Sequence, residues 1–129
     1  MSWSEGYTSE IDYTFGYYQE LNPSRIALPL IATGIKPPRV TRACELGFGQ
    51  GVSLNINAAS SEIQWYGNDF NPNQALFAQQ MAEASGSKAI CTDQSFEQFC
   101  AREDLPQFDF IGLHGIWSWI SDKNRAILA

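Results

Sequence analysis

Short apolar runs alternate with longer stretches of helical periodicity along most of the chain. The apolar runs span 40–46, 63–68, 88–92 and 108–113, and they predict four strands. The stretches between and after them predict helices over 51–59, from 72 onward, over about 95–101, and from Ser121-Asp122 onward. Strands that alternate with helices of this length predict a parallel sheet covered on both faces, an α/β fold.

The pattern also predicts which side chains face the core. In the helix that Asn71-Pro72 opens, one face collects Leu76, Phe77, Gln80, Met81 and Ala84. In the short helix near residue 98, we expect Phe96, Phe99 and Cys100 to point inward. Arg42 lies within the first strand, where parallel strands are usually apolar, so this strand is expected to become buried only from about Ala43.

The first 38 residues differ from the rest, and we divide the chain into an aromatic arm with a lid helix, 1–38, and a main domain, 39–129. The arm carries Trp3, Tyr7, Tyr13, Phe15, Tyr17 and Tyr18. These rings either pack on the core or cover a bound ligand. Asn22-Pro23 predicts a helix start, the helix runs to Gly34, and Pro29 inside it should kink or shorten it.

Composition excludes several classes of function. Eight Lys and Arg against fourteen Asp and Glu give a net charge of −6, and no basic run favours nucleic acid. No apolar run approaches the roughly 20 residues of a membrane span, and the start lacks the features of a secretion signal. We expect a cytoplasmic protein without a membrane contact. Three cysteines without metal-binding spacing and a single histidine predict no metal site.

The chemistry of the chain centres on the turn Glu45-Leu46-Gly47-Phe48-Gly49-Gln50-Gly51, between the first strand and its helix. Glycines allow a tight turn with positive φ and the close approach of a ligand. The unpaired N–H groups of the following helix favour a carboxylate or another anion, and Glu45 could accept hydrogen bonds from an ammonium group. The spacing fits neither a P-loop nor the dinucleotide fingerprint. The alternative is a simple turn with Glu45 in solvent.

The other predicted strands also end in polar or permissive residues. Asp69 follows the second strand, Asp93 the third, and His114-Gly115 the fourth. The carboxyl ends of parallel strands meet at one rim, where ligands of such sheets lie. Asp69 could hold the two hydroxyls of a ribose, and Asp93 the exocyclic amine of a base. For each acid the alternative is a helix cap.

Taken in order, the motifs ELGFGQG, YGNDFNP, CTDQSF and FDFIGLHGIWSWI resemble those of class I S-adenosylmethionine-dependent methyltransferases, whose fold is a Rossmann-like sheet. The resemblance implies S-adenosylmethionine as cofactor and S-adenosylhomocysteine as product. It places the methionine moiety among Glu45, Gly47, Gly49 and Gly51, the ribose at Asp69, and the adenine at Asp93 and Gln94 with Phe70 against its face. Phe48 and Leu113 complete the expected cofactor-binding set.

More narrowly, LHGIWSWI and the upstream YTFGYYQELNPSR look like bacterial methyltransferases that carry a downstream methyltransferase regulatory domain, some of which methylate protein lysines. The resemblance implies a lid formed by Tyr13, Tyr17 and Tyr18 over the cofactor. It implies an acceptor-side wall of His114, Trp117 and Trp119, with His114 a candidate general base and a protein lysine or another amine as acceptor. Paired tryptophans can instead fill core space.

The chain departs from that family in length. The family's sheet has seven strands in the order 3-2-1-4-5-7-6, and the four predicted here would give only 3-2-1-4, so the chain looks truncated. The fourth strand would then be an open edge, through which self-association is expected. Two other functions stay open: a cofactor-binding or regulatory module without catalysis, and a nucleotide-dependent oxidoreductase with a variant glycine turn.

Overall fold

Four parallel strands form one sheet in the computed structural model, which describes residues 16–129. The strands are β1 (Arg42–Leu46), β2 (Gln64–Asn68), β3 (Ile90–Thr92) and β4 (Phe110–Leu113). Their order is β3-β2-β1-β4 and all three pairings are parallel, which confirms the predicted α/β fold and the order 3-2-1-4. The predictions for Trp3, Tyr7, Tyr13 and Phe15 lie outside the described residues.

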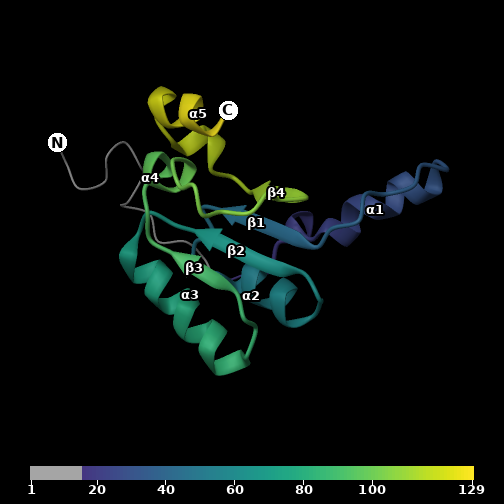
Figure 1. The fold of residues 1–129 in the computed structure, drawn as a ribbon, viewed down its shortest axis with the longest axis horizontal. Coiled ribbons are helices and arrows are strands. Elements are labelled where there is room, and N and C mark those ends of the chain that lie inside the picture. Colours follow the sequence, from purple (N-terminus) through teal and green to yellow (C-terminus); the bar gives the residue numbers. More distant parts are fainter. Residues whose placement is uncertain (1–15) are drawn as a thin grey trace.

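Helices cover both faces of this sheet. The helices α2 (Val52–Ala59) and α3 (Pro72–Ser85) lie on one face, while α4 (Phe96–Cys100) and α5 (Asp122–Leu128) lie on the other (Figure 1). Successive residues of a strand point to opposite faces, so β1 supplies Ala43 to the core beside α2 and α3, and Cys44 and Leu46 to the core beside α4 and α5. Arg42 is exposed and burial begins at Ala43, as predicted.

The buried face of α3 is not the predicted one. Its buried residues are Gln74, Ala75, Ala78 and Ala82, whereas Leu76 and Phe77 are exposed. The small side chains of this face let α3 lie close to α2 and to the glycine turn. A face that carried Leu76 and Phe77 would be too bulky for this contact, so these larger apolar residues are exposed. In α4, Phe96 and Phe99 are buried as predicted. Cys100 is exposed, so the prediction that it points inward was wrong.

The helix α1 (Pro23–Ala32) begins as predicted, with the side chain of Asn22 accepting a hydrogen bond from the Ser24 N–H and Pro23 at the first position. It continues past Pro29 to Ala32. It extends away from the sheet (Figure 1), and Ile26, Leu28 and Ile31 are exposed on it. The short 3-10 helix η1 (Gln19–Leu21) precedes it, and Leu21 is buried.

The register of the strands brings their carboxyl ends to one level. Leu46 of β1 pairs with Asn68 of β2 on one side and with Leu113 of β4 on the other, and Asn68 pairs with Thr92 of β3. The segments that follow the strands therefore share one rim. As predicted, β4 is an edge strand, with Ile111 and Leu113 exposed. Within residues 16–129, no helix is long and apolar enough to cross a membrane.

Candidate functional site

The glycine turn after β1 is fastened to the end of β2 by hydrogen bonds. The Gly47 N–H donates to the Asn68 carbonyl oxygen at 2.7 Å, and the Gly49 N–H donates to the Asp69 Oδ2 at 2.8 Å. Gly47, Gly49 and Gly51 all have positive φ, which confirms the predicted need for glycine. The loop therefore depends on β2 for its shape.

Protein packing also requires two of these glycines. A Cβ at Gly47 would lie 2.8 Å from the Ile116 Cγ2, and a Cβ at Gly51 would lie 2.5 Å from the Cβ of Ala78. Both distances are too short for carbon atoms. The sequence predicted that a ligand approaches these glycines closely. At Gly47 and Gly51 it is Ile116 and Ala78 of the protein itself that do so.

A pocket that is partly open to solvent lies over the glycine turn. The lining comes from the turn, from the first turn of α2, from the segment before α1 and from the end of β4: Gly16, Tyr18, Leu21, Glu45, Gly47, Phe48, Gly49, Gln50, Gly51, Val52, Ser53 and His114. Gly51 is the N-cap of α2 and offers no side chain to the first-turn N–H groups. These donors give the pocket a partial positive charge that favours an anion.

Glu45 is a buried carboxyl group at this pocket. The residue is 3% exposed, and its Oε2 has no hydrogen-bond partner among the residues that the structure describes. Burial, and to a lesser degree the neighbouring Asp69 carboxylate, raise the pKa of Glu45 to about 8. A buried polar oxygen without a partner is unfavourable, so this side chain is suited to a ligand that donates hydrogen bonds and carries positive charge. The alternative of a solvated Glu45 is wrong.

Asp69 is also buried, but its carboxylate has partners. Oδ2 accepts from the Gly49 N–H and Oδ1 from the Asn71 N–H, at 2.8 and 2.9 Å. With its amide nitrogen facing the carboxylate, Gln74 donates to both oxygens at 3.2 and 3.3 Å. Burial raises the pKa of Asp69 to about 6, although the two backbone hydrogen bonds lower it. Asp69 therefore shapes the glycine turn, and its predicted contact with a ribose stays a prediction.

Tyr18 and His114 face each other at the edge of the pocket. Their rings stack with centroids 4.2 Å apart and an interplanar angle of 25°. The Tyr18 N–H donates to the Ser53 Oγ at 2.7 Å, and the His114 Nε2 lies 3.9 Å from the Glu20 Oε2. The Tyr18 ring, the His114 imidazole and the Glu20 carboxylate therefore lie together at this edge of the pocket.

Tyr17 is held outside the pocket. Its hydroxyl donates to the Asn57 Oδ1 at 2.9 Å and accepts from the Asn22 Nδ2 at 3.1 Å, so it fastens the segment before α1 to α2. Of the two described tyrosines predicted for the lid, Tyr18 is the one that lines the pocket. The ring of Phe48 belongs to the core beside α2.

Trp117 and Trp119 lie on the surface. They form the 3-10 helix η2 (Trp117–Trp119) and are 46% and 51% exposed, while Ile116 and Ile120 beside them are buried. The alternative that this pair fills core space is therefore wrong. Leu113, directly before His114, is also exposed. These three side chains remain candidates for contacts with a ligand or an acceptor.

The side chains predicted to bind an adenine do not line the pocket formed by the described residues. Asp93 is exposed and Phe70 is half-buried. The backbone of Gln94 is held by Asn68, and its Oε1 accepts from the Arg102 Nη1 at 3.3 Å. These residues follow β2 and β3, so they lie on the same rim as the glycine turn but beside it.

Sequence reasoning missed Ser53 and Asn68. Ser53 fixes Tyr18, and its position in the first turn of a helix after a glycine turn was an available signal. Asn68 holds the segment after β3. At the end of a strand, a polar residue is usually exposed to solvent, so the sequence contained no sign of this role.

No protein-family model matches the chain. The "Uncharacterized protein sll1526" of Synechocystis sp. (strain ATCC 27184 / PCC 6803 / Kazusa) is 45% identical over an alignment that covers 97% of this chain and 26% of that protein. The chain thus spans about a quarter of the length of this relative.

Two solved structures are similar in fold. PKMT2 from Rickettsia typhi in complex with AdoHcy has a TM-score of 0.77 and 21% identity, covering 90% of this chain and 23% of that one. A SAM-dependent methyltransferase from Thiobacillus denitrificans in complex with S-adenosyl-L-homocysteine has a TM-score of 0.57 and 20% identity, covering 86% and 42%. The sheet of this chain therefore has the Rossmann-like fold of these two proteins.

Proposed function

We propose that this chain is the cofactor-binding part of a class I methyltransferase and binds S-adenosylmethionine and its product S-adenosylhomocysteine over the glycine turn. The observation that carries the proposal is the Oε2 of Glu45, which has no hydrogen-bond partner within residues 16–129 and is buried in the pocket beside the open first turn of α2. An α-amino acid has an ammonium for the carboxylate and a carboxylate for the helix N–H groups. The methionine moiety of the cofactor is such an amino acid.

The adenosine end of the ligand is assigned to the rim after β2 and β3. Asp69 would bind the ribose, Asp93 and Gln94 the adenine, and Phe70 would lie against the base. In support, both similar structures named above contain S-adenosylhomocysteine. The ends of β1, β2 and β3 are level with one another, and these residues directly follow β2 and β3, which also supports the assignment.

For the acceptor we propose an amine, such as a protein lysine. S-adenosylmethionine supplies an activated methyl group, so the protein mainly has to orient the acceptor nitrogen in line with it and keep water away. Tyr18, His114 and Glu20 lie together and would receive the amine at the pocket's edge, and the exposed Trp117 and Trp119 would contact the rest of the acceptor. The His114 Nε2 would receive the proton that the amine must lose.

Calorimetric titration with S-adenosylhomocysteine tests the proposal, with NADH as the rival ligand. We expect saturable binding with one ligand per chain, at least tenfold tighter than for NADH, a difference of about 1.4 kcal/mol. A cooperative thermal unfolding transition serves as the control that the sample is folded. Folded protein that binds NADH as well as the adenosyl ligand, or that binds neither, would contradict the proposed function.

A further inference from the structure

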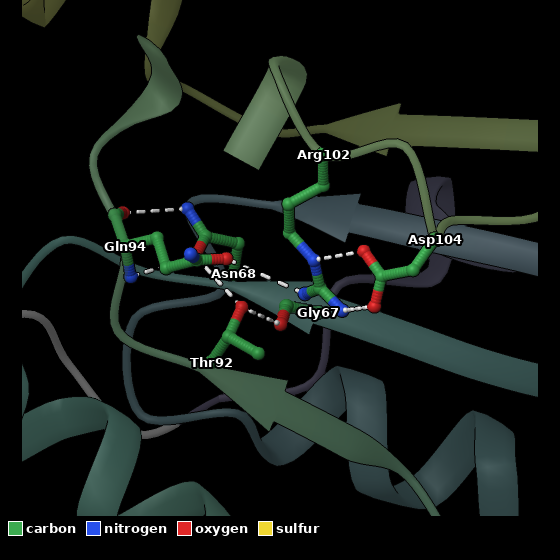
Figure 2. A network of polar contacts seen from close by, with 6 residues as sticks. All are labelled: Gly67, Asn68, Thr92, Gln94, Arg102 and Asp104. Atoms are coloured by element: carbon green, nitrogen blue, oxygen red, sulfur yellow. Dashed lines mark hydrogen bonds and ion pairs between the residues drawn. The ribbon is translucent and has the colours of Figure 1, made fainter. Parts of the chain in front are cut away.

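The side chain of Asn68 makes three hydrogen bonds at the centre of a polar network (Figure 2). The residue is 0% exposed. Its Nδ2 donates to the Gln94 carbonyl oxygen at 2.8 Å, and its Oδ1 accepts from the Gln94 N–H at 3.0 Å and from the Thr92 hydroxyl at 2.8 Å. One side-chain amide thus satisfies both backbone groups of a single residue after β3.

The end of β2, at Asn68 and Asp69, also holds the glycine turn after β1. The backbone carbonyl oxygen of Asn68 accepts from the Gly47 N–H, and the next residue, Asp69, accepts from the Gly49 N–H. The end of β2 therefore fixes the glycine turn through its backbone and through Asp69. It fixes the segment after β3 through the Asn68 amide. A displacement at Asn68 would change the distance between these two segments.

The side chain of Gln94 is in contact with Arg102. Its Oε1 accepts from the Arg102 Nη1, and Arg102 is itself held by two hydrogen bonds to Asp104, at 2.9 and 2.7 Å. Figure 2 shows the Gln94 side chain extending toward Arg102. With the Gln94 side chain turned toward Arg102, Asp93 is the exposed acidic side chain that this segment offers to a ligand.

We propose that Asn68 is a positioning residue that sets Asp93 against the exocyclic amine of the bound base, and so sets the preference for adenine. This inference rests on the proposed function. An amide is suited to the task because it donates and accepts at once. Leu at this position would leave the Gln94 N–H and carbonyl oxygen without partners, which favours a shift of the segment.

The test compares the affinities for S-adenosylhomocysteine and S-inosylhomocysteine, in which a keto oxygen replaces the exocyclic amine. We expect the wild-type chain to prefer the adenosyl ligand at least tenfold. In Asn68→Leu the preference should fall to within about threefold, because Asp93 is displaced. The same fall is expected in Asp93→Asn, which removes the carboxylate charge that faces the exocyclic amine. Combining the two substitutions should add little to either alone, because both remove the same contact.

Asn55→Leu is the matched control. Asn55 is also a buried Asn with three hydrogen bonds, but its partners are Gly51, Ala78 and Ser87. This variant should weaken the binding of both ligands by the same factor and keep the preference for the adenosyl ligand. The inference is overturned if folded Asn68→Leu also keeps the preference. Should Asn68→Leu not fold, Thr92→Val removes one bond to the same amide and should lower the preference about threefold, and an unchanged preference in it overturns the inference.

The outcomes separate this inference from the proposed function. Wild-type protein that binds S-adenosylhomocysteine without any preference over the inosyl ligand contradicts the inference alone. Folded wild-type protein that binds neither ligand contradicts the proposed function, and the inference with it.

Discussion

Glu45→Gln is expected to weaken the binding of S-adenosylhomocysteine by ten- to hundredfold. Glutamine keeps the shape of the side chain but removes the negative charge that would pair with the ligand's ammonium. A hydrogen bond to a charged group contributes about 1.5–3 kcal/mol. Because the wild-type Oε2 is buried and has no partner in the described part of the chain, water competes weakly for this position. Calorimetric titration of both proteins at pH 8 measures the difference, and equal affinities would show that Glu45 does not receive the ammonium.

The pH dependence of ligand affinity tests whether the charge of Glu45, and not only the shape of its side chain, contributes to binding. The pKa of Glu45 is raised to about 8, so at pH 6.5 the unliganded chain holds this carboxyl mostly protonated. Binding of an ammonium favours the carboxylate and releases the proton, so the wild-type affinity should rise as pH rises from 6.5 to 8, by up to about tenfold per pH unit. Glu45→Gln should lack this rise. Titrations at pH 6.5, 7.25 and 8 measure it.

The same substitution should stabilise the unliganded fold. A carboxyl group whose folded pKa is raised contributes stability that is fully present below the unfolded pKa, about 4.5, and is lost as pH rises through the folded value of about 8. The loss can reach about 5 kcal/mol, because the pKa rises from 4.5 to about 8 and each tenfold change in proton affinity is worth about 1.4 kcal/mol. Urea unfolding at pH 8.5 should therefore show Glu45→Gln to be more stable than wild type, and at pH 5 the difference should be small.

Gly51→Ala should lower the free energy of unfolding by about 3 kcal/mol. The left-handed backbone at Gly51, with φ +77°, disfavours alanine by about 1–2 kcal/mol. In addition, the new Cβ would lie 2.5 Å from the Cβ of Ala78, and such overpacking typically adds about 1–3 kcal/mol. The methyl group would push α3 away from the first turn of α2, so ligand binding should weaken as well.

Gly86→Ala is the control for this prediction. Gly86 also has positive φ, at +68°, but its Cβ would meet no described heavy atom within 4 Å. The Gly86→Ala variant should therefore lose only the backbone contribution, about 1–2 kcal/mol. Urea unfolding of the three proteins measures both losses. Equal losses in the two variants would mean that the contact with Ala78 relaxes without energetic consequence.

The strands, their order and the glycine turn were predictable because local patterns encode them. Short apolar runs, caps such as Asn22-Pro23 and glycines at alternate positions act through the backbone of a few neighbouring residues. The position of Glu45 at the pocket follows from the same turn. Its missing hydrogen-bond partner does not, since that depends on every element packed around it.

The features that were wrong or missed depend on contacts between distant segments. The buried face of α3 is set by the contact of Ala78 with Gly51, which favours small residues over Leu76 and Phe77. Trp117 and Trp119 are exposed because Ile116 and Ile120 already occupy the core positions. Asn68 has its role only because β3 lies beside β2 in the sheet.

A crystal structure of the chain grown with S-adenosylhomocysteine tests the central claim most directly. The account predicts the ligand's ammonium within about 3.2 Å of the Glu45 Oε2 and its carboxylate at the first-turn N–H groups of α2. A ligand bound elsewhere on the chain, or one that fills the pocket while the Glu45 Oε2 stays unpartnered, would contradict it.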